Sequence, residues 1–156
     1  MSITPEVLSY ENEAGSLYCL PAGYLHLVWH PGSPRSPHAM QEVFEQILRQ
    51  LQQTGYPRLL TDHRQLTAYG DDMVGWLLAD WLPRVVPTRL LQRVALMGSS
   101  RLAVRPQDDY LFREAGVRYG LQSRCFASAS MPEALTWLLS APSSEKAAVP
   151  ASLTGS

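Results

Sequence analysis

The stretch LLTDHRQL, residues 59–66, decides the fold. Residues 58–61 form a short, mostly apolar run, and three ionisable side chains follow it: Asp62, His63 and Arg64. A short apolar run with a polar exit is typical of a strand that is buried on both faces, as in a parallel sheet. We therefore predict a buried central strand that ends where these three side chains begin.

Helical patterns flank this strand on both sides. The helix before it has one apolar stripe, formed by Met40, Val43, Phe44, Ile47, Leu48 and Leu51. We expect that helix to follow Ser36 as N-cap, to have Pro37 at its first position and to stop at Gly55. After the strand, residues 71–86 predict a Trp-rich helix, which Asp71 or Asp72 could cap and which Pro83 ends or kinks.

The same alternation continues toward the C-terminus. Apolar runs at 93–100 and 123–128 predict strands, and they alternate with a short helix at about 106–115, stopped by Gly116, and a last helix at 130–139. In the last helix, Ser130 and Glu133 have the spacing of a capping box. Strands that alternate with helices predict a largely parallel sheet with right-handed crossovers.

The N-terminal part has a different pattern. Residues 5–10, 16–20 and 24–30 are strand-like runs separated by short turns, so they predict an antiparallel meander. We therefore predict a single α/β domain over residues 1–139 with one mixed, largely parallel sheet. Residues 140–156 are rich in Pro, Ser and Ala without periodicity, and we expect a disordered tail there.

Composition limits the classes of function. Hydrophobic residues make up 46% of the 156 residues and charged residues 17%, as in globular proteins. A formal net charge of -1 gives no electrostatic footprint for nucleic acid or an anionic membrane. No apolar run is long enough to cross a bilayer, and the N-terminus lacks the pattern of a signal peptide. We expect a cytoplasmic protein without membrane insertion, in which Cys19 and Cys125 are buried thiols.

Several anchors resemble a known family. The strand LLTDHR, the Trp-bearing helix WLLADWLP, the strand RVALMGS, the strand RCFAS and the helix EALTWLL together resemble the SpoIIAA-like group, which belongs with the STAS and CRAL-TRIO folds. The resemblance covers roughly residues 16–140. It implies an anti-sigma-factor-antagonist topology, in which STAS members carry a phosphorylatable serine at the N-terminus of the helix after the central strand. This chain departs there, because no serine or threonine follows Asp62 before Thr67.

Strand alternation constrains the three ionisable residues. It places Asp62 and Arg64 on one face and His63 on the other, so adjacency alone does not make them a catalytic set. In a structural interpretation, Asp62 or Arg64 bonds loop backbone or pairs with another charge. In a functional interpretation, the three form a polar rim at the carboxyl end of a parallel strand, where Arg64 holds an anionic group and His63 is a titratable contact.

Other polar residues give weaker signals. His26 and His30 share a strand face, and we interpret that face as solvated, because strand rise keeps the two rings too far apart to share a metal. Asp108 and Asp109 fit the first turn of the short helix, at its positive end. We therefore predict no metal site and no cofactor.

The Trp-rich helix is the most apolar segment. Met73, Trp76, Leu77 and Trp81 lie on one face, and further apolar residues lie near another, so the helix has two faces to cover. The sheet covers one. We expect Met73, Trp76, Leu77 and Trp81 to form an interaction surface, first of all with a second copy of the chain.

The sequence therefore predicts a non-enzymatic regulatory or protein-interaction module that forms a homodimer. The alternative is a carrier or sensor that binds a small apolar or anionic ligand between the second helix and the sheet, with Asp62, His63 and Arg64 at the rim. No set of nucleophile, base and orienting group stands out, so we predict no catalytic residues.

Overall fold

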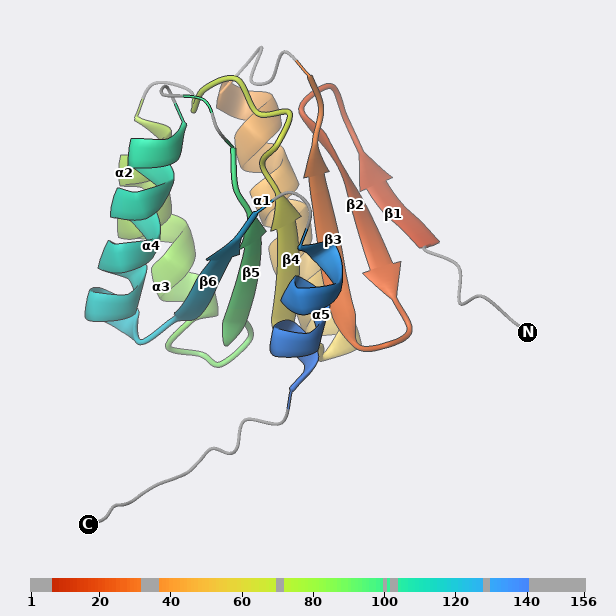
Figure 1. Ribbon diagram of the computed structural model, residues 1–156. Coiled ribbons are helices and arrows are strands. Elements are labelled where there is room, and N and C mark those ends of the chain that lie inside the picture. The colour runs from red at the N-terminus through yellow and green to blue at the C-terminus, as the bar shows by residue number, and fades with distance from the viewer. Residues whose placement is uncertain are drawn as a thin grey trace.

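The computed structural model describes residues 7–31, 37–69, 72–99, 101, 104–127 and 130–140. Its centre is a six-stranded sheet with the strand order β1-β2-β3-β4-β5-β6 (Figure 1). The strands are β1 (Val7–Glu11), β2 (Gly15–Leu20), β3 (Tyr24–Trp29), β4 (Arg58–Asp62), β5 (Arg93–Met97) and β6 (Gln122–Phe126). β1, β2 and β3 pair antiparallel, whereas β3, β4, β5 and β6 pair parallel. The predicted mixed sheet with an N-terminal antiparallel meander is confirmed.

Helices connect the parallel strands, as the alternation predicted. They are α1 (Pro37–Thr54), α2 (Met73–Trp76), the π-helix η1 (Leu77–Trp81), α3 (Leu82–Val85), α4 (Arg105–Tyr119) and α5 (Met131–Leu139). α2, η1 and α3 follow one another without a break and correspond to the predicted Trp-rich helix. None of the helices in the described part of the chain is long and apolar enough to span a membrane.

Alternate strand positions build two cores, one on each face of the sheet. On one face, residues such as Leu27 and Trp29 pack with the helices α1, α2, η1, α3 and α4. On the other, Leu60, Met97 and Phe126 pack against α5. Figure 1 shows α5 in front of β4, and α1 behind the sheet. Over the described residues, α5 is thus the helix that covers the second face, and β1 and β2 have none in front of them.

Two glycines decide where helices end. α1 begins at Pro37 and is followed by Gly55, whose positive φ of 72° and N–H bond to Leu51 O end the helix as predicted. The predicted end of α4 at Gly116 is wrong. The helix continues to Tyr119, and Gly120 with a φ of 80° ends it. Gly116 lies inside the helix, where an added Cβ would be 3.4 Å from the carbonyl oxygen of Leu121.

The side-chain caps predicted at Asp72 and Ser130 do not form. Asp72 and Ser130 hold the N-cap positions of α2 and α5, but neither side chain makes a capping hydrogen bond. Their backbones explain this: Asp72 has a φ of 59°, and Ser130 has φ -106° and ψ 28°, whereas a capping side chain requires an extended backbone. The other predicted caps, Ser36 and Asp71, lie outside the described residues, as does the tail from residue 141 onward.

Candidate functional site

Polar residues gather where β4, β5 and β6 end. Five of the six buried polar side chains that the described residues contain lie at this edge: Thr61, Asp62, His63, Ser99 and Asp108. A cleft of about 610 Å³ opens beside them, lined in part by Arg64, Ser99, Arg105, Asp108, Asp109 and Cys125. Open parallel sheets commonly bind ligands at the carboxyl ends of their strands. We call this feature the carboxyl-edge cleft.

Asp62 and Arg64 bind each other. Arg64 donates from Nη2 to Asp62 Oδ2 at 2.6 Å, from Nε to Oδ1 at 2.9 Å, and from its backbone N to Oδ1 at 3.0 Å. Burial tends to raise the pKa of Asp62, but the hydrogen bonds from Arg64 outweigh it, so this pKa lies below its usual value. The predicted shared face and the predicted charge pairing are both confirmed. The guanidinium that was expected to hold an anion already has a carboxylate partner.

The functional interpretation placed His63 at the rim, but the structure does not. The His63 side chain points to the opposite face and is buried, with 3% of the residue exposed. His63 Nδ1 lies 3.0 Å from both carboxylate oxygens of Asp108, and Nε2 lies 2.9 Å from Thr61 Oγ1. Tyr69 donates its hydroxyl hydrogen to Asp108 as well. We call Thr61, His63, Tyr69 and Asp108 the buried network.

The buried network has the atomic order of a catalytic triad but lacks access. A hydroxyl, an imidazole and a carboxylate follow one another in Thr61, His63 and Asp108, as in hydrolases that use a serine nucleophile. Thr61 is 3% exposed, and Trp29 and Tyr69 both contact the His63 ring edge-on. A substrate carbonyl could therefore not reach the hydroxyl. In this arrangement the network satisfies buried polar groups, which otherwise cost several kcal/mol.

The space between the second helix and the sheet is too small for the predicted ligand. The cavity there has a volume of about 40 Å³ and is lined by Thr61, His63, Tyr69, Leu77, Trp81 and further apolar residues. One water molecule occupies about 30 Å³ in the liquid. Side chains of the core fill this space, so the cavity gives the predicted location no support.

The prediction of two buried thiols is wrong for Cys125. This side chain is exposed at the carboxyl-edge cleft, and Cys19 is half-buried; neither forms a disulfide. Partial burial, together with the negative charges of Asp108 and Asp109, raises the pKa of the Cys125 thiol. A raised pKa lowers the thiolate fraction, and the thiolate is the reactive form.

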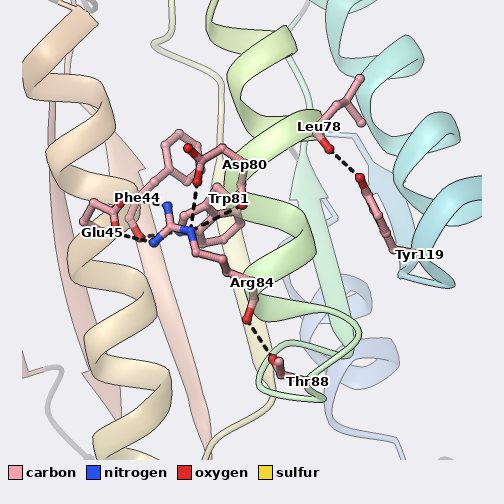
Figure 2. Close-up of polar contacts among 8 residues, drawn as sticks. All are labelled: Phe44, Glu45, Leu78, Asp80, Trp81, Arg84, Thr88 and Tyr119. Atoms are coloured by element: carbon pink, nitrogen blue, oxygen red, sulfur yellow. Dashed lines mark hydrogen bonds and ion pairs between the residues drawn. The ribbon is translucent and has the colours of Figure 1, made fainter.

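The second helix lies mostly in the core of its own chain. Met73, Leu77 and Trp81 are between 1% and 2% exposed, and Trp76 is half-buried against the same core. Trp81 also donates its indole N–H to the carbonyl oxygen of Phe44 at 2.7 Å, which ties η1 to α1 (Figure 2). Of the four residues expected to form an interaction surface, Trp76 alone is accessible to another molecule.

A proline follows the π-helix in this segment. Leu82 donates its N–H to Leu77 O, five residues back, which is the π pattern. The residue five positions after Leu78 is Pro83, which has no N–H to donate. Figure 2 shows the substitute: the hydroxyl of Tyr119 donates to Leu78 O at 2.6 Å and joins α4 to η1. Pro83 therefore does not end the helix, and a tertiary hydrogen bond satisfies the carbonyl of Leu78.

On the outer side of this segment, Arg84 joins three elements. Its guanidinium donates to Glu45 of α1 at 2.6 and 2.9 Å, and to Asp80 Oδ1 at 2.9 Å (Figure 2). The hydrogen bonds from Arg84 lower the pKa of Glu45. All three side chains are more than a quarter exposed, so we assign them a minor share of stability.

The two strand histidines are half-buried, whereas the sequence suggested a solvated face. His30 Nε2 lies 2.7 Å from Ser16 Oγ and 3.5 Å from Glu11 Oε2. His26 stacks in a tilted contact with Tyr18, the residue opposite it on β2. Within the described ranges, no three His, Cys, Asp or Glu side chains gather so that they could hold a metal ion.

Sequence reasoning missed the partners of His63. Thr61 could have been predicted as a partner, because residues two apart on a strand share a face. Asp108 was recognised only as a first-turn acid of α4, although α4 begins at the same edge of the sheet where β4 ends. Because the carboxyl ends of parallel strands meet at one edge of the sheet, the sequence could have indicated that Asp108 lies near His63.

The comparisons with known proteins add no relative. No family model, no curated protein and no solved structure matches the chain.

Proposed function

We propose that this protein is a non-enzymatic binding module that holds a small polar ligand in the carboxyl-edge cleft. The observation that carries the proposal is the cleft itself, about 610 Å³ at the carboxyl ends of three parallel strands. Ligand sites commonly measure about 300–1,000 Å³ and contain a few polar groups on an otherwise apolar wall. Ser99 supplies a buried polar group, and Phe126 supplies an apolar one.

Two observations favour binding over catalysis. The hydroxyl–imidazole–carboxylate series is sealed in the core, where Thr61 and His63 are each 3% exposed. The one thiol at the cleft, Cys125, has a raised pKa, so it is a weak nucleophile at neutral pH. A binding module needs neither group to react.

The charges at the cleft favour a ligand with both an acidic and a basic group. Arg105 and Asp109 are exposed, lie one helical turn apart on α4 and both line the cleft. Over the described residues neither forms an ion pair, whereas Arg64 is already bound to Asp62. A zwitterion could place its carboxylate at Arg105 and its ammonium at Asp109.

Native mass spectrometry of gently purified protein tests this function. Ala127→Trp adds a bulky side chain at an exposed position that lines the cleft, and Ala22→Trp adds the same group at the exposed β2–β3 turn as a matched control. We expect a small-molecule adduct on the wild type and on A22W, and its loss from A127W. A clean apo mass for all three proteins, or an adduct that survives in A127W, would contradict the proposal.

A second candidate function is association with another copy of the chain through β1. This strand lies at one edge of the sheet, and its Val7 and Leu8 are 55% and 50% exposed. An edge strand presents unpaired backbone groups that can pair with a second strand. Homodimers commonly use the same patch on both copies, and an edge strand suits such a two-fold contact.

Light scattering distinguishes this second candidate. Leu8→Lys should convert a dimer to a monomer, because the charge would be buried in the contact. Val117→Lys on α4 is the matched control, since Val117 is also an exposed apolar residue. A monomeric wild type, or a dimer that persists in L8K, would remove the β1 contact.

A further inference from the structure

A second concave feature lies at the opposite edge of the sheet. Where β4, β5 and β6 begin, a groove of about 620 Å³ opens. Its polar lining includes Arg58, Arg89, Arg93, Gln92 and Gln122. Its apolar lining includes Val86, Pro87 and Leu91. We call it the amino-edge groove.

Two of its arginines are direct neighbours in the sheet. Arg58 opens β4 and Arg93 opens β5, and the parallel register places them opposite each other. Like charges at directly opposed strand positions repel, so sheets rarely retain them without compensation. Burial and the positive charge of Arg58 both lower the pKa of Arg93, as expected of repulsion that no acid offsets.

Among the described residues, no carboxylate lines the groove. Arg93 is held by neutral acceptors: it donates to Gln122 Oε1 at 2.9 Å, to Trp137 O at 2.6 Å and to Ser140 Oγ at 2.7 Å. Within the part of the chain that is described, Arg58 and Arg89 form no ion pair. By contrast, Arg64, Arg84 and Arg118 each have a carboxylate partner. The groove therefore concentrates positive charge in a chain whose net charge is -1.

Backbone strain marks the same place. Arg89 has a φ of 66°, in the left-handed region that favours glycine or asparagine. Its N–H donates to Val86 O at 2.9 Å, which closes the turn. Arg89 is exposed and has no ion pair among the described residues, so no contact there explains why a cation occupies a strained position. Strained residues cluster at ligand-binding sites.

We propose that the amino-edge groove binds a small organic phosphate, with Arg58 and Arg89 holding the phosphoryl group and the apolar wall holding its organic body. A phosphate monoester carries a charge of about -1.5 to -2 at neutral pH and three acceptor oxygens. It can therefore satisfy more than one guanidinium fork, whereas a single carboxylate matches one. The groove has the volume of a small-molecule site. This site is separate from the carboxyl-edge cleft.

The proposal is tested by titrating the folded protein with phenyl phosphate and recording its ¹⁵N NMR spectrum at each step. Benzoate and inorganic phosphate are the comparison probes. We expect phenyl phosphate to shift amide signals around residues 86–93 and 120–122. Benzoate and inorganic phosphate should bind at least tenfold more weakly, because the first lacks the second charge and the second lacks the apolar body. Equal binding of benzoate would overturn the assignment of a phosphoryl group, and no saturable shift in the groove would overturn the site.

Two double variants separate a built site from general charge attraction. Arg58→Gln with Arg89→Gln should weaken phenyl phosphate at least tenfold. Arg49→Gln with Arg101→Gln removes the same charge from exposed positions outside the groove and should change affinity less than twofold. An equal loss of affinity in both double variants would show general charge attraction and no built site. Arg58→Lys with Arg89→Lys keeps the charge and controls for a folding defect, and it should give intermediate affinity. Unchanged affinity in R58Q/R89Q would contradict the proposal.

Discussion

The two edges of the parallel sheet differ in how the charged residues at the strand ends are paired. Where β4 ends, the buried carboxylate of Asp62 binds Arg64, and the buried carboxylate of Asp108 binds His63. At the amino edge, Arg58 and Arg93 lie side by side in a groove that no carboxylate of the described residues lines. The first arrangement stabilises the chain, because its members satisfy one another. The second has positive charge that no carboxylate in the described ranges compensates, and an external anion could do so.

The difference teaches that a concentration of polar residues does not by itself identify a ligand contact. Asp62, His63 and Arg64 looked like the functional residues because they are adjacent and ionisable. In the structure their hydrogen-bonding groups are largely occupied from within. The residues with unmet charge are less conspicuous in sequence, because Arg58, Arg89 and Arg93 each stand alone.

The largest expected effect on stability comes from removing the carboxylate at the centre of the buried network. Asp108→Ala leaves His63 and Tyr69 without their shared partner in the core. Each buried polar group left unsatisfied typically costs about 1–3 kcal/mol of unfolding free energy, and two groups lose their partner here. Urea denaturation of wild type and variant measures the loss.

Asp109→Ala is the matched control for that experiment. Asp109 is the next residue on α4, but it is exposed and lies outside the network. Its removal should change the unfolding free energy by about 0.5 kcal/mol or less. If D108A and D109A were equally stable, the buried network would not depend on the carboxylate of Asp108.

A smaller effect should appear at alkaline pH through Tyr69. Burial, the negative charge of Asp108 and the hydrogen bond to it raise the pKa of Tyr69 well above its usual value. The unfolded chain has a tyrosine pKa of about 10, so above that pH it binds fewer protons than the folded chain. The stabilising contribution of Tyr69 is therefore complete below about pH 10 and is lost as pH rises toward the folded pKa.

Stability measured against pH checks this with Tyr69→Phe. The variant should lose about 1–3 kcal/mol at neutral pH, because Asp108 loses a buried donor. It should also show a shallower decline in stability between pH 10 and 11 than the wild type. Tyr110→Phe, at an exposed position on α4, should keep the wild-type slope. Parallel pH curves for wild type and Y69F would mean that the Tyr69 hydroxyl titrates as if in water.

Much of the fold followed from local pattern. The buried run at residues 58–61, the stripe of α1 and the turn residues between the N-terminal runs predicted the mixed sheet, because the period of apolar residues reflects which face is buried. The capping predictions failed at Asp72 and Ser130, since their backbone angles depend on how the preceding loops pack. Pro83 was predicted to end or kink its helix, and the rescue by Tyr119, 36 positions later, could not be read locally.

The candidate sites were predicted less well, for a related reason. Alternation along one strand correctly separated Asp62 and Arg64 from His63. It could not show that Asp108 meets His63, because that contact depends on how α4 is rotated against the sheet. It could not show the neighbouring arginines either, since residues 58 and 93 become adjacent only through strand register.

The smallest predicted effect has the opposite sign and concerns the amino edge. Arg89→Gly removes a side chain from a left-handed backbone position that glycine adopts without strain. Relief of that strain exceeds the entropic cost of glycine, so the unfolding free energy should rise by about 0.5–1 kcal/mol. Arg101→Gly, at an exposed arginine without a positive φ, should lower it instead. The same R89G protein should bind phenyl phosphate more weakly, because it loses one of the two guanidinium groups. Higher stability with weaker binding would show that the strained arginine is retained for its charge, whereas a loss of both would mean that Arg89 supports the turn itself.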